Sequence, residues 1–415
     1  MTSKSRNWYL FLLGSALLGL TVGLHDPSFN NYLSEVHHVS PTIRGLLEFP
    51  REGPGCVIAL LSGALAFLPD TRVASLAVVV WGLGLLGMAL FSPTLGAMVV
   101  WMIAVSVGSH VYLPLTQSLG VAVSGNERVG RRLGQLAGAT TAATILGAAF
   151  VWFGTRFLGV GYSVIFTAAA GFAFLGALCF LPMRVAPAPR AAASPRRVAS
   201  KRQYRLFYLL NILFGARKQV FLTFGPWVIV RVFGQPASTI AMLWMISSFL
   251  GIGFRPVLGR LVDTLGERKV LMGEAALLIL ICLGYALGAN VTLAGVVLGL
   301  PIIYACFVLD HMLAAVTIAR TSYLWKIAED PTDMTPALSL GISLDHVVAM
   351  AVPALGGLAW TRWGYEYVFL AAAVFAGVNL FAASRIRVPH DRSACGLPSS
   401  ETAKLAEPAP TGVGS

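Results

Sequence analysis

Long apolar runs separated by short polar stretches dominate this sequence. Each run is about 20 residues long, which is the length that an α-helix needs to cross the hydrocarbon core of a bilayer. The runs do not alternate with a period of two, as the strands of a membrane β-barrel do. Because backbone polar groups in hydrocarbon must be satisfied within their own segment, the pattern predicts transmembrane helices. Twelve spans are predicted, at residues 8–33, 44–68, 73–92, 95–120, 133–155, 159–182, 205–232, 237–259, 270–289, 293–319, 334–360 and 365–385.

The composition supports an integral membrane protein. Of 415 residues, 56% are hydrophobic and only 12% are charged, whereas a soluble protein carries about 25% charged residues. The mean hydropathy is +0.75. The first span is too long for a signal peptide and has no convincing small-residue cleavage site, so we expect it to be a membrane helix.

The net charge of +12 has a topological explanation. If the N-terminus is cytoplasmic, 22 of the 30 Lys and Arg residues fall in the termini and in loops on the cytoplasmic side. The opposite side holds four of them, among which is Arg44 at the start of the second span. This asymmetry predicts that both termini are cytoplasmic. The cations are scattered over short loops, so we expect no nucleic-acid partner.

The chain divides into two similar halves. The segment "MRVAPAPRAAASPRRVASKRQY" at 183–204 is rich in Pro, Ala and Arg and resembles a flexible linker. On either side of it, "GYSVIFTAAA" (161–170) matches "GYEYVFLAAA" (364–373). Internal duplication is a plan that secondary transporters use. We therefore expect an all-α membrane protein with two pseudo-symmetric six-helix bundles. The predicted units are an N-terminal bundle over 1–182, a cytoplasmic linker over 183–204, a C-terminal bundle over 205–388 and a disordered tail over 389–415.

Several chemistries have no support in the sequence. The five cysteines show no spacing typical of a metal site or a disulfide framework. A Gly-rich Walker loop is missing, so ATP is not indicated as an energy source. No catalytic residue, cofactor or metal is expected, and the chain is not expected to be an enzyme.

Charged residues inside predicted spans are the most informative feature, because each costs about 2.5–3.5 kcal/mol at the centre of a bilayer on insertion scales. In the first span Asp26 and Asn30 share a face and are candidates for substrate binding. In the second, Glu48 and Arg51 are placed to form an ion pair and are candidates for a gate. That pairing leaves Glu52 available to carry a proton or to contact another helix. The alternative is an ion pair near the headgroups with no further role.

Polar residues of the later spans suggest binding and proton coupling. His110 lies near the middle of the fourth span and is a candidate for substrate binding, or a hydrogen-bonded structural residue. One dipeptide occurs twice, as Asp310-His311 and Asp345-His346. Burial disfavours the charged forms of carboxylate and imidazole, so that both can gain and lose a proton near neutral pH, as a proton carrier must. We expect these four residues to be the coupling groups, with a cross-helix contact such as Asp345 with His311, or else a neutral structural network.

Two adjacent cations lie deep in the seventh span. Arg217 is about 12 residues, or ~18 Å, from the start of that helix, too deep to reach the headgroups comfortably. We expect Arg217 to bind an anionic substrate and Lys218 to be an internal counter-ion or to share in binding. The alternative is that both neutralise buried carboxylates such as Asp26, Asp310 or Asp345. Glu274, four residues into the ninth span, is expected at the membrane interface with no role.

The stretch "GRLVDTLGERKVL" (259–271) resembles the loop signature of the major facilitator superfamily. The matching residues are Gly259, Asp263, Gly266, Arg268 and Lys269, with Glu267 as a local variation. The segments "GARKQVFLTFGPWVIV" and "LLEFPREGPG" also resemble a bacterial branch of that superfamily. The resemblance implies the inner membrane of a bacterium, twelve helices around a central cavity, transport by rocking of the two halves, and a gating role for these five residues. Gly259 and Gly266 are expected to allow close packing and a tight turn. The corresponding first-half copy is degraded, because Phe67 stands where the signature has Asp.

Together these features predict a secondary active transporter that moves a small polar, anionic organic solute by alternating access, coupled to protons. We expect it to act as a monomer in the lipid bilayer. One alternative is proton-driven efflux of cationic or amphipathic compounds. A second is a non-transporting membrane receptor built on a transporter scaffold.

Overall fold

The computed structural model describes residues 3–64, 67–124, 129–185, 201–293, 295–328 and 333–387. Within these ranges the chain is almost entirely helical. The predicted tail at 389–415 and most of the predicted linker at 183–204 lie outside the described residues.

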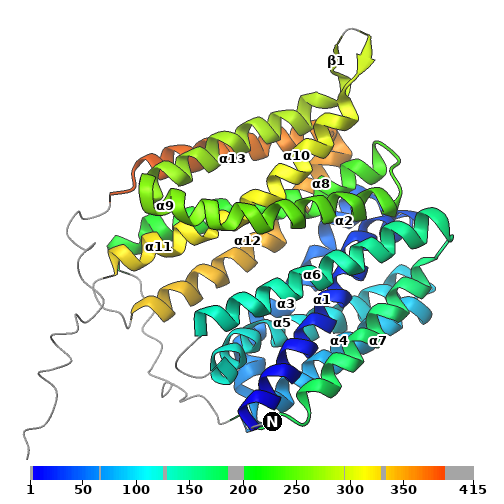
Figure 1. The fold of residues 1–415 in the computed structure, drawn as a ribbon. Coiled ribbons are helices and arrows are strands. Elements are labelled where there is room, and N and C mark those ends of the chain that lie inside the picture. The colour runs from blue at the N-terminus through cyan, green and yellow to red at the C-terminus, as the bar shows by residue number, and fades with distance from the viewer. Residues whose placement is uncertain are drawn as a thin grey trace, which may run out of the picture.

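The first half holds the N-terminal helices, drawn blue to green in Figure 1. They are α1 (Ser3–Glu35), α2 (Pro41–Leu46), α3 (Glu48–Ala64), α4 (Asp70–Leu90), α5 (Leu95–Ser124), α6 (Val129–Phe157) and α7 (Tyr162–Phe180). α2 and α3 together replace the predicted second span. Ser40 caps α2 by accepting a hydrogen bond from the backbone N–H of Ile43 at 3.3 Å, and Pro41 occupies the first turn.

The second half holds the remaining elements, drawn green to orange in Figure 1. They are the 3₁₀ turn η1 (Arg202–Tyr204), α8 (Arg205–Arg231), α9 (Ala237–Leu287), η2 (Gly288–Asn290), β1 (Thr292–Leu293), β2 (Val296–Val297), α10 (Gly299–Leu313), η3 (Ala314–Val316), α11 (Thr317–Ile327), α12 (Met334–Trp363) and α13 (Tyr365–Ser384). The two strands pair in antiparallel fashion and form a hairpin that projects from one end of the molecule (Figure 1).

The 51-residue helix α9 combines two of the predicted spans. A straight helix of that length would reach about 77 Å, more than twice the ~30 Å of a hydrocarbon core. The chain turns at Gly266, whose φ of 80° and ψ of 160° are not helical. Among the described residues, nine helices are long and apolar enough to cross a membrane. With α9 counted as two arms, and with the more polar α2–α3 and α8, the fold is consistent with twelve crossings.

The halves touch on the side of the molecule opposite the chain termini, which we call the distal side. There α2 packs on α12 so closely that a Cβ at Gly45 would collide with the backbone of Pro353. The hydroxyl groups of Thr42 and Thr361 are 2.8 Å apart across the same contact. Glycine is required at this crossing because the two backbones meet directly.

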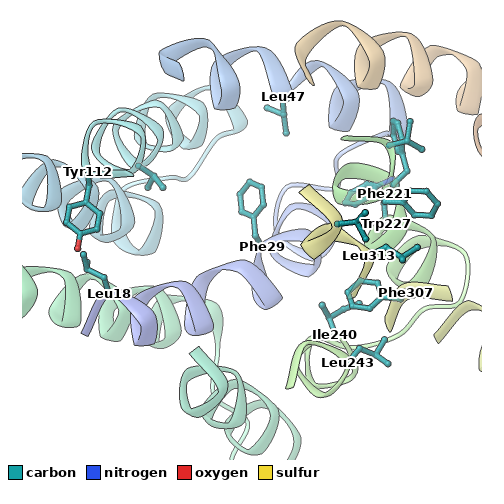
Figure 2. Close-up of a cluster of buried hydrophobic side chains, with 14 of the residues drawn as sticks. Leu18, Phe29, Leu47, Tyr112, Phe221, Trp227, Ile240, Leu243, Phe307 and Leu313 are labelled. Atoms are coloured by element: carbon teal, nitrogen blue, oxygen red, sulfur yellow. The ribbon is translucent and has the colours of Figure 1, made fainter. Parts of the chain in front are cut away.

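Apolar side chains fill the space between the helices and also cover the outer surface. Figure 2 shows Trp227, Leu313 and Phe307 beside Ile240 and Leu243, so that α8, α9 and α10 share a core. Large apolar side chains also point outward, such as Leu113 and Val374, which are 66% and 67% exposed. Such a surface is costly in water and suits contact with lipid.

Candidate functional site: a central cavity

A cavity of about 370 Å³ lies between the two halves. Helices α1, α3, α4 and α5 form one side of it, and α8, α9 and α10 form the other. Its polar and charged lining consists of His25, Asp26, Asn30, Arg51, Glu52, Ser106, Ser109, His110 and His311. Its aromatic lining consists of Phe29, Trp81, Trp244 and Phe307. The cavity therefore combines six of the residues predicted for binding, coupling or gating, which come from separate spans.

Glu48 is the centre of a buried ion-pair network on the distal side of the cavity. Its carboxylate is 2.5 Å from Nη1 of Arg44 and 2.8 Å from Nε of Arg51. It also accepts hydrogen bonds from Gln219 at 2.7 Å and from Thr223 at 3.1 Å, both on α8 of the other half. The predicted pair of Glu48 with Arg51 is present, and it belongs to a network that joins the halves.

Arg44, which the loop charges place on the outer side, is a member of this network. Its side chain is fully buried, and its Nε donates a hydrogen bond to Asn30 at 3.0 Å. α2 begins at Pro41 directly after a short loop, so Arg44 already lies between helices α1 and α3. Burial of this guanidinium is offset by its contacts with Glu48 and Asn30.

Glu52 joins two imidazoles from different halves. Its Oε2 is 3.2 Å from Nδ1 of His346 on α12 and 3.8 Å from Nε2 of His110 on α5. Its other oxygen is 3.2 Å from Nη2 of Arg51. The expected contact of Glu52 with another helix is present, whereas the expectation that Arg51 leaves Glu52 free is wrong. One reason is geometric, because the guanidinium of Arg51 is a fork that reaches two carboxylates at once.

Both deep cations of α8 are paired with carboxylates. Nη1 of Arg217 is 2.7 Å from Asp310 on α10, and Nζ of Lys218 is 2.5 Å from Asp345 on α12. The side chain of Arg217 is 3% exposed, and neither cation is among the described residues that line the cavity. In this conformation both are internal counter-ions. A role of Arg217 in binding would require its release from Asp310.

The expected contact of Asp345 with His311 is wrong. Lys218 occupies the position next to Asp345, and His311 instead stacks on Phe307 with ring centroids 4.4 Å apart. His311 also lies edge-on to Trp244 at 5.2 Å. Adjacent residues on a helix point about 100° apart, so Asp310 faces α8 while His311 faces the cavity.

Asp26 is the most open acidic group of the cavity. Its side chain is 41% exposed, and one carboxylate oxygen is 2.8 Å from Nδ1 of His25. Asn30, one turn further along α1, is occupied by Arg44. Both of these α1 residues line the cavity, and Asp26 is the more exposed of the two.

The model of the family described as "Major Facilitator Superfamily" matches residues 11–324. The chain belongs to the major facilitator superfamily. It is therefore a multi-pass membrane protein and a secondary transporter rather than an enzyme, as its spans and loop signature predict. No curated protein matches the sequence.

Solved structures of transporters in this superfamily share the fold. A mutant of the nucleoside transporter NupG is similar with a TM-score of 0.76 at 16% identity over 91% of this chain and 98% of that one. A bacterial homolog of the human lysosomal transporter Spinster, in an inward-facing and occupied conformation, gives 0.69 at 14% identity over 93% and 98%. A D-xylose–proton symporter gives 0.68 at 14% identity over 94% and 98%. Identities this low establish the superfamily fold and leave the solute open.

The superfamily loop signature lies at the turn in α9. Gly266 has the positive φ that a tight turn requires of glycine. The close packing expected at Gly259 is wrong, because a Cβ there would meet no atom within 4 Å. Asp263, Arg268 and Lys269 are exposed, and among the described residues none of them forms an ion pair. Their gating roles stay predictions.

The residue of the signature that does bind a partner is Glu267. It is buried, 2.7 Å from Nζ of Lys326, and accepts a hydrogen bond from Ser322 at 2.6 Å. It therefore ties the turn of α9 to α11. The same half contains a second ion pair that the sequence does not predict. Glu274 is 3.4 Å from Arg320, and both side chains are nearly fully buried. The expectation that Glu274 reaches the membrane interface is wrong, because α9 buries that face against α11.

Proposed function

We propose that this transporter moves a small polar organic solute bearing an anionic group, coupled to protons, by rocking of the two halves about the central cavity. Arg51 carries the proposal. Among the described residues that line the cavity it is the only Lys or Arg. Its side chain is 28% exposed, so part of the guanidinium faces the space that a solute would fill.

The donors of Arg51 support recognition of a carboxylate or a similar planar anion. Its Nε is used by Glu48 and its Nη2 by Glu52. The guanidinium carries further N–H donors in a rigid fork. A solute carboxylate placed against that fork would form paired, charge-assisted hydrogen bonds, which are among the stronger polar contacts in proteins.

We propose Asp310 as the coupling carboxylate. It is held by Arg217 at 2.7 Å, and its side chain is 13% exposed. Protonation of Asp310 would cancel its attraction to Arg217 and weaken the link between α8 and α10. A proton would thus change the packing of helices that border the cavity. His311, which lines the cavity beside Asp310, gives a route for the proton.

A second candidate function is efflux of cationic or amphipathic compounds in exchange for protons. The observation in its favour is the open carboxylate of Asp26 in a cavity that is also lined by the rings of Phe29, Trp81, Trp244 and Phe307. Carboxylates attract cations, and aromatic faces bind them by cation–π contact.

Uptake into proteoliposomes separates the two functions. Labelled small carboxylates and labelled lipophilic cations would each be tested with and without a pH gradient. For anion transport we expect Arg51→Gln to abolish uptake of the accepted carboxylate and Asp26→Asn to preserve it. The reverse result, with a cation as the accepted compound, would replace the first function by the second. If no compound accumulates, the receptor alternative gains support.

Coupling has its own test. Asp310→Asn should abolish accumulation driven by an acidic exterior, while exchange of labelled for unlabelled solute at equal pH continues. The control is His25→Asn, which alters a cavity imidazole on α1 away from Asp310. Undiminished pH-driven accumulation in Asp310→Asn would assign coupling to another group, and Asp345 is the next predicted carboxylate.

The orientation of the chain follows from its loop charges. We propose that the protein lies in a bacterial inner membrane with both termini in the cytoplasm. The distal contacts between α2 and α12 would then close the outer side, so this conformation would face the cytoplasm. Tags at Ser3 and at residue 387 should both be protected from protease added to intact spheroplasts.

A further inference from the structure

Glu52, His110 and His346 present three ligand atoms to one point. Each offers one oxygen or nitrogen, and these atoms lie within 4.8 Å of one another. We propose that the three side chains bind a divalent transition-metal cation of the Zn²⁺ class, and that the bound ion holds the two halves of the transporter together. The proposal does not depend on which solute is carried.

The spacing fits such an ion. Zn²⁺ binds His nitrogen and carboxylate oxygen at about 2.0–2.2 Å in tetrahedral geometry, which places neighbouring ligand atoms about 3.3 Å apart. The Glu52 oxygen is 3.2 Å from Nδ1 of His346 and 3.8 Å from Nε2 of His110. Small side-chain movements bring the set to bonding distance. A carboxylate with two imidazoles is a donor set that favours Zn²⁺ and its neighbours over Mg²⁺ or Ca²⁺.

Two of the ligands are already oriented by outer partners. Nδ1 of His110 lies 2.9 Å from the carbonyl oxygen of Ser106, to which it can donate its proton. In that tautomer Nε2 keeps its lone pair and faces Glu52. The second oxygen of Glu52 is held by Arg51 at 3.2 Å. Support of this kind is typical of metal ligands, where it fixes the tautomer and the direction of the donor atom.

Gly55 makes the meeting of the two imidazoles possible. A Cβ at this position would lie 2.6 Å from Cε1 of His346 and 2.9 Å from Cδ2 of His110. Any larger residue would push both rings away from Glu52. The glycine lies on the same helix as Glu52, less than one turn further along α3.

The ligands come from both halves of the transporter. Glu52 on α3 and His110 on α5 belong to the first half, whereas His346 on α12 belongs to the second. Rocking of the halves would pull His346 away from the other two. An ion that binds this arrangement better than any other shifts the population toward it. We therefore expect the metal to slow exchange between conformations.

Sequence spacing gives no sign of this site. The ligands are separated by 58 and 236 residues along the chain, whereas metal motifs are recognised by short intervals. Only the packing of α3, α5 and α12 brings them together.

Metal binding to the purified full-length protein tests the site directly. Zn²⁺ would be titrated in competition with a chromophoric chelator, and Co²⁺ would be added to record the visible absorption of a tetrahedral complex. We expect one equivalent to bind. Glu52→Gln, His110→Asn and His346→Asn each remove one metal ligand and should each weaken Zn²⁺ binding at least tenfold. Loss of only the hydrogen-bonding partner of a ligand already weakens metal binding about 10–100-fold. Each should also remove the Co²⁺ band.

Two control variants test whether other side chains near the cluster bind the metal. His311→Asn removes a cavity imidazole outside the cluster, and Cys56→Ser removes a thiol one turn from Glu52. Both should bind Zn²⁺ as the native chain does. Gly55→Ala keeps all three ligands and should still weaken binding, since its methyl group displaces the rings. Thermal melting without metal shows whether a variant is folded.

A distance measurement tests the link between the halves. Spin labels would be placed at Val121 on α5 and at Ser339 on α12, near the ends of these helices on the side of the termini. Zn²⁺ should narrow the distribution of distances in the native background and leave it unchanged in His346→Asn. Native affinity in the three ligand variants would overturn the site. Binding of Zn²⁺ with no change in the distance distribution would overturn the link.

Discussion

The carboxylate of Glu48 on α3 accepts a hydrogen bond from the side-chain amide of Gln219 on α8 at 2.7 Å. The two residues are 171 positions apart and belong to different halves of the transporter. Both are fully buried. The contact therefore lies at the boundary that must open if the distal side is to be exposed.

Removing this contact should favour the distal-open conformation. A hydrogen bond to a charged group contributes about 1.5–3 kcal/mol, so Gln219→Leu should reduce the ratio of distal-closed to distal-open protein roughly tenfold or more. Cysteines replacing Thr42 and Thr361, whose hydroxyl groups are 2.8 Å apart, report closure by the rate at which they form a disulfide. The native cysteines would first be replaced by serine.

A matched control keeps the test specific. Ser322→Ala removes a hydrogen bond to another buried carboxylate, Glu267, within the second half. We expect it to leave the rate of disulfide formation unchanged. Equal rates in Gln219→Leu and in the parent would show that Gln219 does not hold the distal side closed.

The pair of Arg217 and Asp310 makes a prediction about stability. Removal of one partner from a buried ion pair leaves the other charge uncompensated and costs about 3–5 kcal/mol. Arg217→Gln and Asp310→Asn should each lower Tm strongly, whereas the double variant should recover part of the loss. If the double variant is no more stable than the worse single one, the two side chains do not stabilise each other.

The same variants separate a counter-ion from a substrate clamp. If Arg217 serves only Asp310, the double variant should bind the accepted solute with near-native affinity in a thermal-shift titration. Loss of solute binding in a folded double variant would restore the direct binding role predicted for Arg217.

The sequence predicts the fold well because the bilayer sets the length of each apolar run. The predicted span 365–385 agrees with α13 at Tyr365–Ser384, and 133–155 lies within α6. Other spans differ in detail, as the division of the second into α2 and α3 shows, and the tenth begins late. Its predicted start at 293 falls on residues that form the β1–β2 hairpin, and the helix begins only at Gly299. An apolar hairpin cannot be distinguished from the start of a helix by hydropathy alone.

Pairing of charges could not be predicted in the same way. Arg217 and Asp310 are 93 residues apart, and a helix must be rotated correctly about its axis for them to meet. That rotation is set by the packing of whole helices rather than by local sequence. Arg320 shows the consequence, since its place next to the end of the predicted tenth span gives no sign that it is buried against Glu274.

The buried pair of Glu274 and Arg320 is predicted to stabilise the second half. The Cζ atom of Arg320 also lies 3.5 Å from the ring centroid of Phe214 on α8, and a desolvated cation–π contact contributes about 2 kcal/mol. Glu274→Gln should lower the free energy of unfolding by about 3–5 kcal/mol, because the guanidinium would remain buried without its carboxylate. Phe214→Leu should have a smaller effect.

Thermal unfolding in detergent measures both variants. Asp263→Asn is the matched control, because Asp263 is an exposed carboxylate of the same helix and forms no ion pair among the described residues. Its replacement should change Tm little. A Tm for Glu274→Gln equal to that of the control would mean that Arg320 finds other compensation.

Gly266 and Gly259 both belong to the loop signature and both lie in α9, but their surroundings differ. Gly266 has φ 80° and ψ 160°, a region essentially restricted to glycine, so Gly266→Ala should cost about 1–3 kcal/mol. A Cβ at Gly259 meets nothing within 4 Å, and alanine is favoured over glycine inside a helix by about 1 kcal/mol. Gly259→Ala should therefore preserve or raise Tm. Transport by this second variant decides whether Gly259 has a gating role, because a loss of rate in a protein of undiminished stability cannot be attributed to misfolding.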